Sequence, residues 1–194
     1  MKVSNTNHWF PFNPEKAIEA ISYFLSNYEG KSMPMIKLIK MLYYSEKESL
    51  KMYDFPIFGE ELYSLPFGPV VSKSYDMVKE ENLKGSSLSE NFKREGKYIQ
   101  LIKEVPIEKL SEAEIEIMSG IFERFKGMTE AQIIDYGHDK KFTPEWRDPG
   151  SSSIPIAHQD LFHLFDRSES EIREIQEYAK ECRSLELATA KYAY

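Results

Sequence analysis

Residues 34–53 constrain the fold most, because apolar side chains cover more of this predicted helix than a single neighbouring element can bury. Two adjoining stripes at helical spacing run along it: Met35-Leu38-Leu42 and Ile36-Ile39-Tyr43-Leu50. A helix on a protein surface carries one apolar stripe that faces the core. We therefore expect this helix to be the central helix of the core, covered on two sides.

Capping signals predict further helices around it. Asn13-Pro14 combines an N-cap residue with proline at the first helical position, and starts a helix that Gly30 closes. Capping boxes at Ser111-Glu114 and Thr129-Gln132 start two more helices. Apolar residues at helical spacing predict additional helices over 70–81, 157–165 and 170–190.

The remaining segments indicate a small β component. Prolines and glycines are dense over residues 54–71, which excludes a long helix and favours a short strand with a fixed turn. Residues 92–102 have the pattern of a hairpin that turns at Glu95-Gly96. We expect a predominantly helical α+β fold, with a helical core, a small antiparallel sheet or hairpin, and a C-terminal helical extension.

The chain is long enough for one sizeable core and short for two ordinary domains, so a single domain is expected. Residues 1–12 are predicted to be an N-terminal tail whose aromatic residues pack back on the body. Residues 13–150 are predicted to form the main domain. Residues 151–194 are predicted to form a helical extension that packs on the same domain.

Composition limits the classes of partner. The chain has 32 acidic and 25 basic side chains and a net charge of −7, which disfavours nucleic-acid binding and suits a basic protein partner. Neither a secretory signal nor a run of about 20 apolar residues that could span a bilayer is apparent, so no membrane partner and a cytoplasmic location are expected. Cys182 is the single cysteine, and it is expected to pack inertly.

No motif points to catalysis or to a cofactor. There is no glycine-rich phosphate loop, and Gly68-Pro69 has a proline where such a loop needs a free backbone N–H. His158 and His163 are five residues apart, which does not place both on one helix face as a zinc pair requires. We expect no catalytic residue, metal or cofactor, and keep a metal-dependent hydrolase centred on His138 as an alternative.

The order of motifs is more specific than the composition. These are Glu15 to Ile21, Lys37 to Glu48 (KLIKMLYYSEKE), Phe55 to Gly59, Leu65 to Val70 (LPFGPV) with Tyr75, and Tyr136 to Trp146. This order resembles the Panacea domain, also called the SocA-like or phage-associated GepA family, over about residues 13–147. The residues that carry the motif, expected to be structural, are Leu38, Leu42, Tyr43, Tyr44, Glu46, Gly59, Pro66, Gly68, Pro69, Val70, Tyr75, His138 and Trp146.

The resemblance implies an antitoxin, encoded beside a toxin gene, that neutralises the cognate protein toxin by direct contact. It implies that the protein belongs to a toxin–antitoxin system of a bacterium or a phage. The toxins of such systems include toxic small alarmone synthetases. Some members of the family instead act as adaptors that deliver a toxin to a protease. The identity of the toxin, the contact face and the stoichiometry stay open, as does a homo-oligomer formed through the toxin or the C-terminal helix.

We expect the antitoxin to work by occlusion, with an acidic and aromatic face covering the substrate pocket of the toxin. The residues predicted to bind the partner are Glu60, Glu61, Tyr63, Phe67 and Tyr136. The segment 65–70 has two readings: a rigid connection buried in the core, or a preorganised corner presented to the partner.

Overall fold

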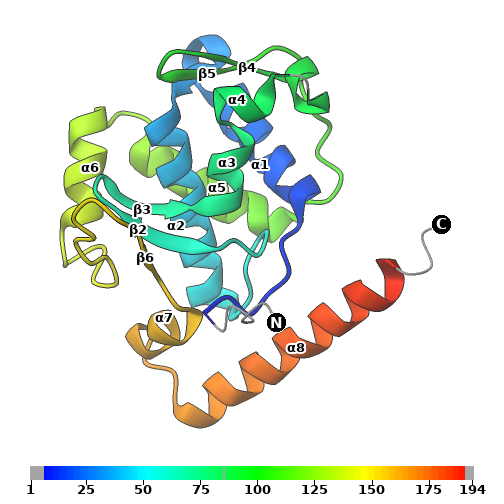
Figure 1. Cartoon of the computed structure of the whole chain (residues 1–194), viewed down its shortest axis with the longest axis vertical. Coiled ribbons are helices and arrows are strands. Elements are labelled where there is room, and N and C mark those ends of the chain that lie inside the picture. Colours follow the sequence, from blue (N-terminus) through cyan, green and yellow to red (C-terminus); the bar gives the residue numbers. More distant parts are fainter. Residues whose placement is uncertain (1–6, 85, 191–194) are drawn as a thin grey trace.

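Helix α2 (Met35–Tyr53) passes through the middle of the computed structural model, which describes residues 7–84 and 86–190 (Figure 1). Every residue from Lys37 to Glu46 is buried, including the charged ones at both ends of that stretch. Such burial on all sides requires neighbours around the whole helix. The prediction of a central helix is confirmed.

Capping residues start the helices that pack around α2 as the sequence predicts. The side chain of Asn13 accepts a hydrogen bond from the backbone of Lys16 and begins α1 (Pro14–Asn27). Both capping boxes are formed, at the starts of α5 (Glu112–Phe125) and α6 (Glu130–His138). Helix α1 ends earlier than predicted, and Gly30 instead lies in the short 3-10 turn Glu29–Lys31 with a positive φ of 69°.

One three-stranded antiparallel sheet has the order β1-β5-β4. Strands β4 (Phe92–Glu95) and β5 (Tyr98–Leu101) form the predicted hairpin, with Glu95 opposite Tyr98. Strand β1 (Ser32–Pro34) pairs with β5 and is not predicted by the sequence pattern. Three residues directly before a helix offer too short a pattern for strand prediction.

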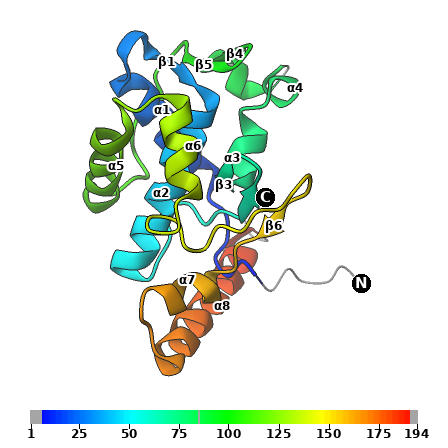
Figure 2. The ribbon, with the colours of Figure 1, turned by 90° about the vertical axis from the view of Figure 1, so that its left-hand side faces the viewer.

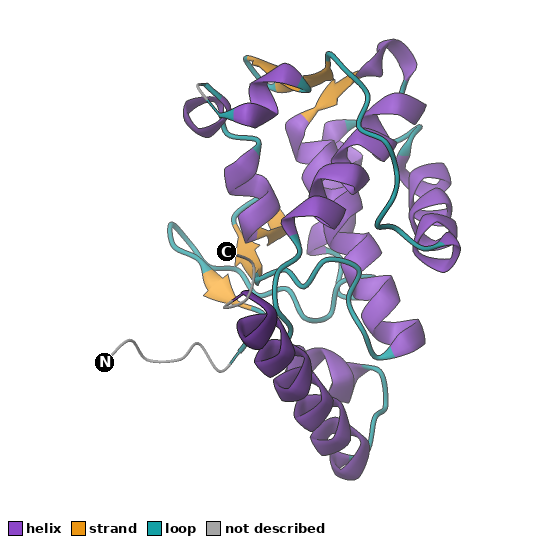
Figure 3. Ribbon diagram, turned by 90° about the vertical axis from the view of Figure 1, so that its right-hand side faces the viewer, coloured by secondary structure: helices purple, strands orange, loops and turns teal. Residues whose placement is uncertain are grey.

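The second sheet has the order β3-β2-β6 and lies apart from the first (Figure 3). Strands β2 (Leu62–Leu65) and β3 (Gly68–Val71) form a tight hairpin, and β6 (Ile154–Pro155) adds an edge. The predicted helix over 70–81 is therefore wrong at its start. Val70 and Val71 are β-branched and pair in the sheet, and the helix that follows is two pieces, α3 (Ser72–Met77) and α4 (Glu80–Leu83). Between α4 and β4 lies the 3-10 turn Ser87–Glu90.

The N-terminal segment lies against the C-terminal helices α7 (His158–Leu164) and α8 (Glu169–Ala190) (Figures 1 and 2). Trp9 is buried and stacks on Phe162 with ring centres 5.5 Å apart. Its backbone N–H donates to Nδ1 of His158 at 3.1 Å. Farther along, Arg183 of α8 donates to the backbone carbonyl of His8. Residues 1–6 of the predicted tail lie outside the described residues.

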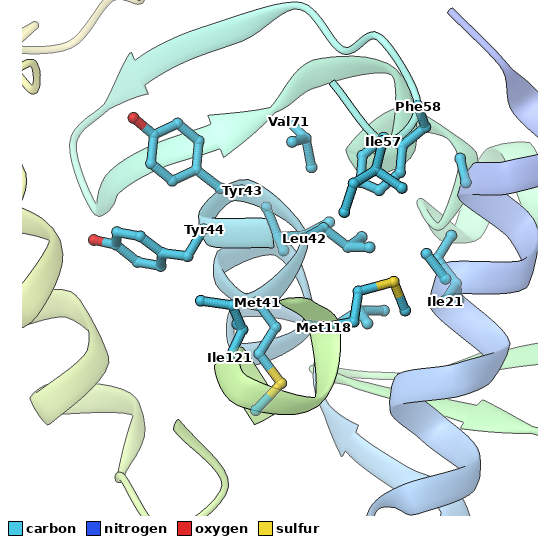
Figure 4. Close-up of a cluster of buried hydrophobic side chains, with 14 of the residues drawn as sticks. Ile21, Met41, Leu42, Tyr43, Tyr44, Ile57, Phe58, Val71, Met118 and Ile121 are labelled. Carbon is cyan, nitrogen blue, oxygen red and sulfur yellow. The ribbon is translucent and has the colours of Figure 1, made fainter. Parts of the chain in front are cut away.

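Apolar side chains from several elements close around α2 (Figure 4). The close-up labels Ile21, Met41, Leu42, Tyr43, Tyr44, Ile57, Phe58, Val71, Met118 and Ile121. They come from α1, α2, the turn before β2, β3 and α5, and all are buried. The core thus packs α1 and α5 against α2, and the β2–β3 hairpin lies on it through Val71.

Candidate partner-binding surface

The carboxylate of Glu46, on α2, fixes the turn that precedes β2. Its Oε2 accepts hydrogen bonds from the backbone N–H groups of Ile57 at 2.6 Å and Phe58 at 3.2 Å, and its Oε1 accepts one from Glu60 at 2.9 Å. Burial raises the pKa of Glu46 to about 7, although these backbone donors act in the opposite direction. A single buried carboxylate thus supplies the hydrogen-bond acceptors that a neighbouring strand or a helix would otherwise offer to the backbone N–H groups of this turn.

Gly59 lies in the same turn and touches the N-terminal segment backbone to backbone. Its φ is 72°, and a Cβ built on it would stand 1.9 Å from the carbonyl oxygen of Pro11. No side chain fits this position without separating the two segments. Gly59 therefore ties the position of the N-terminal segment to the turn that leads into β2.

Glu60 is buried, and its carboxylate caps helix α3 instead of facing solvent. Oε2 accepts from the backbone N–H of Lys73 at 2.9 Å, and Oε1 accepts from that of Ser74 at 2.7 Å. Burial raises the pKa of Glu60 to about 7. The expectation that Glu60 touches a partner is therefore corrected, because its oxygens already satisfy helix N–H groups in the interior.

A buried lysine supports the tip of the β2–β3 hairpin. The Nζ of Lys40 donates to the carbonyl oxygen of Pro69 at 2.6 Å, and burial lowers the pKa of Lys40 to about 7. Gly68 has a φ of 93°, and a Cβ there would stand 3.0 Å from this Nζ. On the other side, a Cβ on Gly137 of α6 would stand 3.2 Å from Cδ of Pro69. Lys40, Gly68 and Gly137 thus allow the hairpin to lie close on α2 and α6.

The two motif tyrosines join α2 to the loop after α6. The hydroxyl of Tyr43 donates to Oε1 of Glu145 at 2.5 Å, and the Nζ of Lys47 lies 2.7 Å from the same oxygen. The hydroxyls of Tyr44 and Thr143 lie 2.7 Å apart. Burial is the largest cause that raises the pKa of both tyrosines, so both hydroxyls stay protonated.

Trp146 and His138 lie beside this loop and β2. The indole Nε1 of Trp146 donates to the carbonyl oxygen of Leu65 at 3.0 Å. The His138 ring lies over Trp146 with centres 4.3 Å apart, and its Nε2 is buried without a hydrogen-bond partner. Within residues 7–84 and 86–190, no three or more His, Cys, Asp or Glu side chains gather as metal ligands. The contacts of His138 in this structure are those of packing.

Phe67, at the tip of the hairpin, is 64% exposed. It borders an apolar cavity of about 270 Å³. The lining consists of Met35, Ile36, Ile39, Lys40, Leu65, Pro66, Phe67, Gly68, Val70 and Tyr75. An exposed aromatic ring beside an apolar hollow, on a stiff hairpin, is the arrangement that protein interfaces use as an anchor. The other apolar motif residues, Leu38, Leu42 and Val70, are buried in the core.

A family model described as "Antitoxin SocA-like, Panacea domain" matches residues 38–147, which is more than half of the chain. The chain belongs to this family. No curated protein and no solved structure matches it significantly. In the described part of the chain, no helix has both the length and the apolar character needed to cross a bilayer.

The Panacea match begins inside α2 and ends just after Trp146. It contains the β2–β3 hairpin, most of the lining of the Phe67 cavity and the Tyr43–Glu145 contact, whereas α1, α7 and α8 lie outside it. The predicted resemblance is confirmed over this range. Its N-terminal motif, Glu15 to Ile21, lies outside the match.

The residues predicted to bind a partner do not form one patch on the Panacea domain. Tyr63 is half-buried, and its hydroxyl donates to Oε2 of Glu61 at 3.4 Å. Glu61 also lies 3.5 Å from the Nζ of Lys73. Tyr136 borders a different hollow, where its ring stacks on Phe142 with centres 4.3 Å apart. Only Phe67 combines a high exposure with an apolar cavity, so it is the best-supported member of the set.

Sequence reasoning missed the polar side chains that hold this surface in place. Lys40 and Glu145 are charged, and charged residues are ordinarily assigned to solvent. Lys40 does fall among apolar residues of α2, between Ile39 and Met41, and that position was the available signal. Glu145 and Thr143 follow Tyr43 and Tyr44 by about a hundred residues, so no local pattern joins them.

Proposed function

We propose that this protein is an antitoxin that neutralises a cognate protein toxin by direct binding, without catalysis of its own. The family match over residues 38–147 supports this proposal more than any other observation. The toxin is expected to be encoded beside the antitoxin and to meet it in the cytoplasm. A toxin–antitoxin pair of this kind fits a role in defence against phage.

The proposed contact surface is centred on Phe67 and the apolar cavity beside it. Exposed aromatic side chains near a hollow supply much of the binding energy in protein interfaces. Pro66, Pro69 and the Lys40 hydrogen bond fix the hairpin before binding, which reduces the entropy lost on association. Glu61 and Tyr63 lie at the start of the same hairpin but do not border this cavity; Glu61 borders a hollow beside the N-terminal segment, and Tyr136 borders another hollow.

The charge of the molecule supports occlusion of a substrate site. A toxin that acts on nucleotides or tRNA must present positive charge to its substrate, and a net charge of −7 is complementary to it. A toxic small alarmone synthetase is a toxin of this class. The antitoxin then keeps the substrate out by covering the site.

Coexpression with the product of the adjacent gene tests the proposal. We expect rescue of growth and co-elution of the two proteins in size-exclusion chromatography. Phe67→Ala is expected to reduce both, while Tyr98→Ala, which removes an exposed ring on the other sheet, leaves both unchanged. Rescue without co-elution, accompanied by disappearance of the toxin, would instead identify a protease adaptor. Failure of the unaltered pair to rescue and to co-elute would overturn the proposal.

A further inference from the structure

A second hollow lies between the C-terminal half of α2, α5, α6 and the start of the loop that leads to α7, and has a volume of about 370 Å³. Its lining differs from that of the Phe67 cavity, because it is rich in charged and aromatic side chains. The basic members are Lys47, Lys51, Arg124 and Lys141, and the acidic members are Glu48 and Glu145. Ligand sites of small molecules begin at about this size.

Three of the four cations that border this hollow have no charge partner among the residues that the structure describes. Lys47 is neutralised by the buried carboxylate of Glu145. Within the described part of the chain, Lys51, Arg124 and Lys141 form no ion pair. Glu48 is the acid that opposes them, so positive charge is in excess here although the whole chain carries −7. Unpaired cations that converge on a hollow in an acidic protein favour an anionic ligand.

The aromatic side of the hollow offers a flat surface. The Phe142 ring is 39% exposed and stacks on Tyr136, whose ring is inclined to it by only 11°, and both rings border the hollow. The Nζ of Lys141 lies over the Phe142 ring, 5.3 Å from its centre, in a cation–π contact that a stacking base would replace. Phe165 borders the same hollow from the end of α7. A flat ring next to free cations suits a ligand that has both a planar base and a phosphate.

We propose that this hollow binds a nucleotide, with the base against Phe142 and the phosphates near Lys51, Arg124 and Lys141. The guanidinium of Arg124 can donate two parallel hydrogen bonds to one phosphate, and the two ammonium groups add point charges. This ligand is bound by the antitoxin itself, and the proposal does not depend on which toxin is the partner or on whether Phe67 binds it.

Isothermal titration calorimetry of the full chain at low salt tests the inference. The probes are ADP and GDP, with the corresponding nucleosides and inorganic phosphate in separate titrations. We expect a nucleoside diphosphate to bind at least about 10-fold more tightly than either part alone, because both halves of the site contribute. Raising the salt concentration is expected to weaken the binding, since the three cations are solvent-exposed.

Arg124→Ala and Lys141→Ala are each expected to weaken this binding by about 10-fold, which is the loss of one charge-assisted contact. Arg173→Ala is the matched control, because it removes an exposed arginine of α8 that does not border the hollow. Equal affinity for inorganic phosphate and the diphosphates would overturn the nucleotide assignment. Absence of saturable binding, or binding unchanged in both pocket variants, would overturn the site.

Discussion

The ammonium nitrogen of Lys40 donates a hydrogen bond to the carbonyl oxygen of Pro69 at 2.6 Å within the protein interior. This contact joins the central helix to the strand that follows the exposed Phe67. It also accounts for Gly68, because a Cβ there would approach the same nitrogen. The stiffness of the hairpin thus arises from a buried amino group in the core as well as from its two prolines.

Lys40 is predicted to make the protein more stable as the pH rises from about 7 towards 10. Burial lowers its pKa from 10.5 to about 7, so its contribution to stability is present above the unfolded value and is lost as the pH falls through about 7. Lys40→Met, measured by urea unfolding at pH 7 and pH 9.5, is expected to remove this part of the pH dependence. Lys103→Met, on an exposed lysine, is the control and is expected to leave it unchanged.

Glu46 and Glu60 are predicted to make the protein less stable as the pH rises from about 5 to 8. Burial raises the pKa of each from 4.5 to about 7, so their contribution is fully present below 4.5 and is lost as the pH rises through about 7. Urea unfolding at pH 5 and pH 8 measures it. Glu60→Gln is expected to flatten this dependence relative to the unaltered protein.

The pH dependence of stability is compared between Glu60→Gln and the unaltered protein, because the buried histidines also change the stability in this pH range. Burial lowers the pKa of His8 to about 4 and that of His158 to about 3, so their contribution is lost as the pH falls below 6.5. Both histidines are present in each protein, so their contributions to the free energy of unfolding cancel in the difference. A pH dependence of Glu60→Gln equal to that of the exposed control Glu181→Gln would contradict the prediction.

Gly59→Ala is predicted to destabilise the protein by about 3 kcal/mol, through backbone strain at a positive φ and a collision with the Pro11 carbonyl. Chemical denaturation checks the value. Gly120→Ala provides the contrast, since Gly120 lies within α5 and nothing stands within 4 Å of the added Cβ. That change is expected to stabilise the protein by about 0.5–1 kcal/mol. Two changes of the same sign would contradict this account.

Tyr43→Phe is predicted to cost about 1.5–3 kcal/mol, because it removes a buried hydrogen bond to a carboxylate and leaves the ring in place. Tyr98→Phe is expected to change the free energy of unfolding by less than about 0.5 kcal/mol, since Tyr98 is 42% exposed. Thermal and urea unfolding of the two variants give the comparison. Similar losses in both would show that the Glu145 contact contributes little.

The local patterns of the sequence predict the helices well and the contacts of the site poorly. The stripes of α2 predict a helix covered on more than one side, and capping boxes place the starts of α5 and α6. Val70 and Val71 were assigned to a helix because their pairing with Tyr63 and Leu62 depends on a turn whose geometry the sequence leaves open. Glu60 was assigned to the surface because nothing in its neighbours indicates that its carboxylate caps a helix thirteen residues on.

The packing of Trp9 and Phe10 against residues of α7 has a consequence for the order in which the molecule is completed. Trp9 and Phe10 contact a segment that is synthesised about 150 residues after them. A nascent chain can therefore contain the whole Panacea region before the residues of α7 that pack on Trp9 and Phe10 have been synthesised. A chain cut short before residue 158 would leave Trp9 without Phe162 and Phe10 with Phe55 as its aromatic neighbour, and would expose an apolar surface that other proteins in the cell could bind.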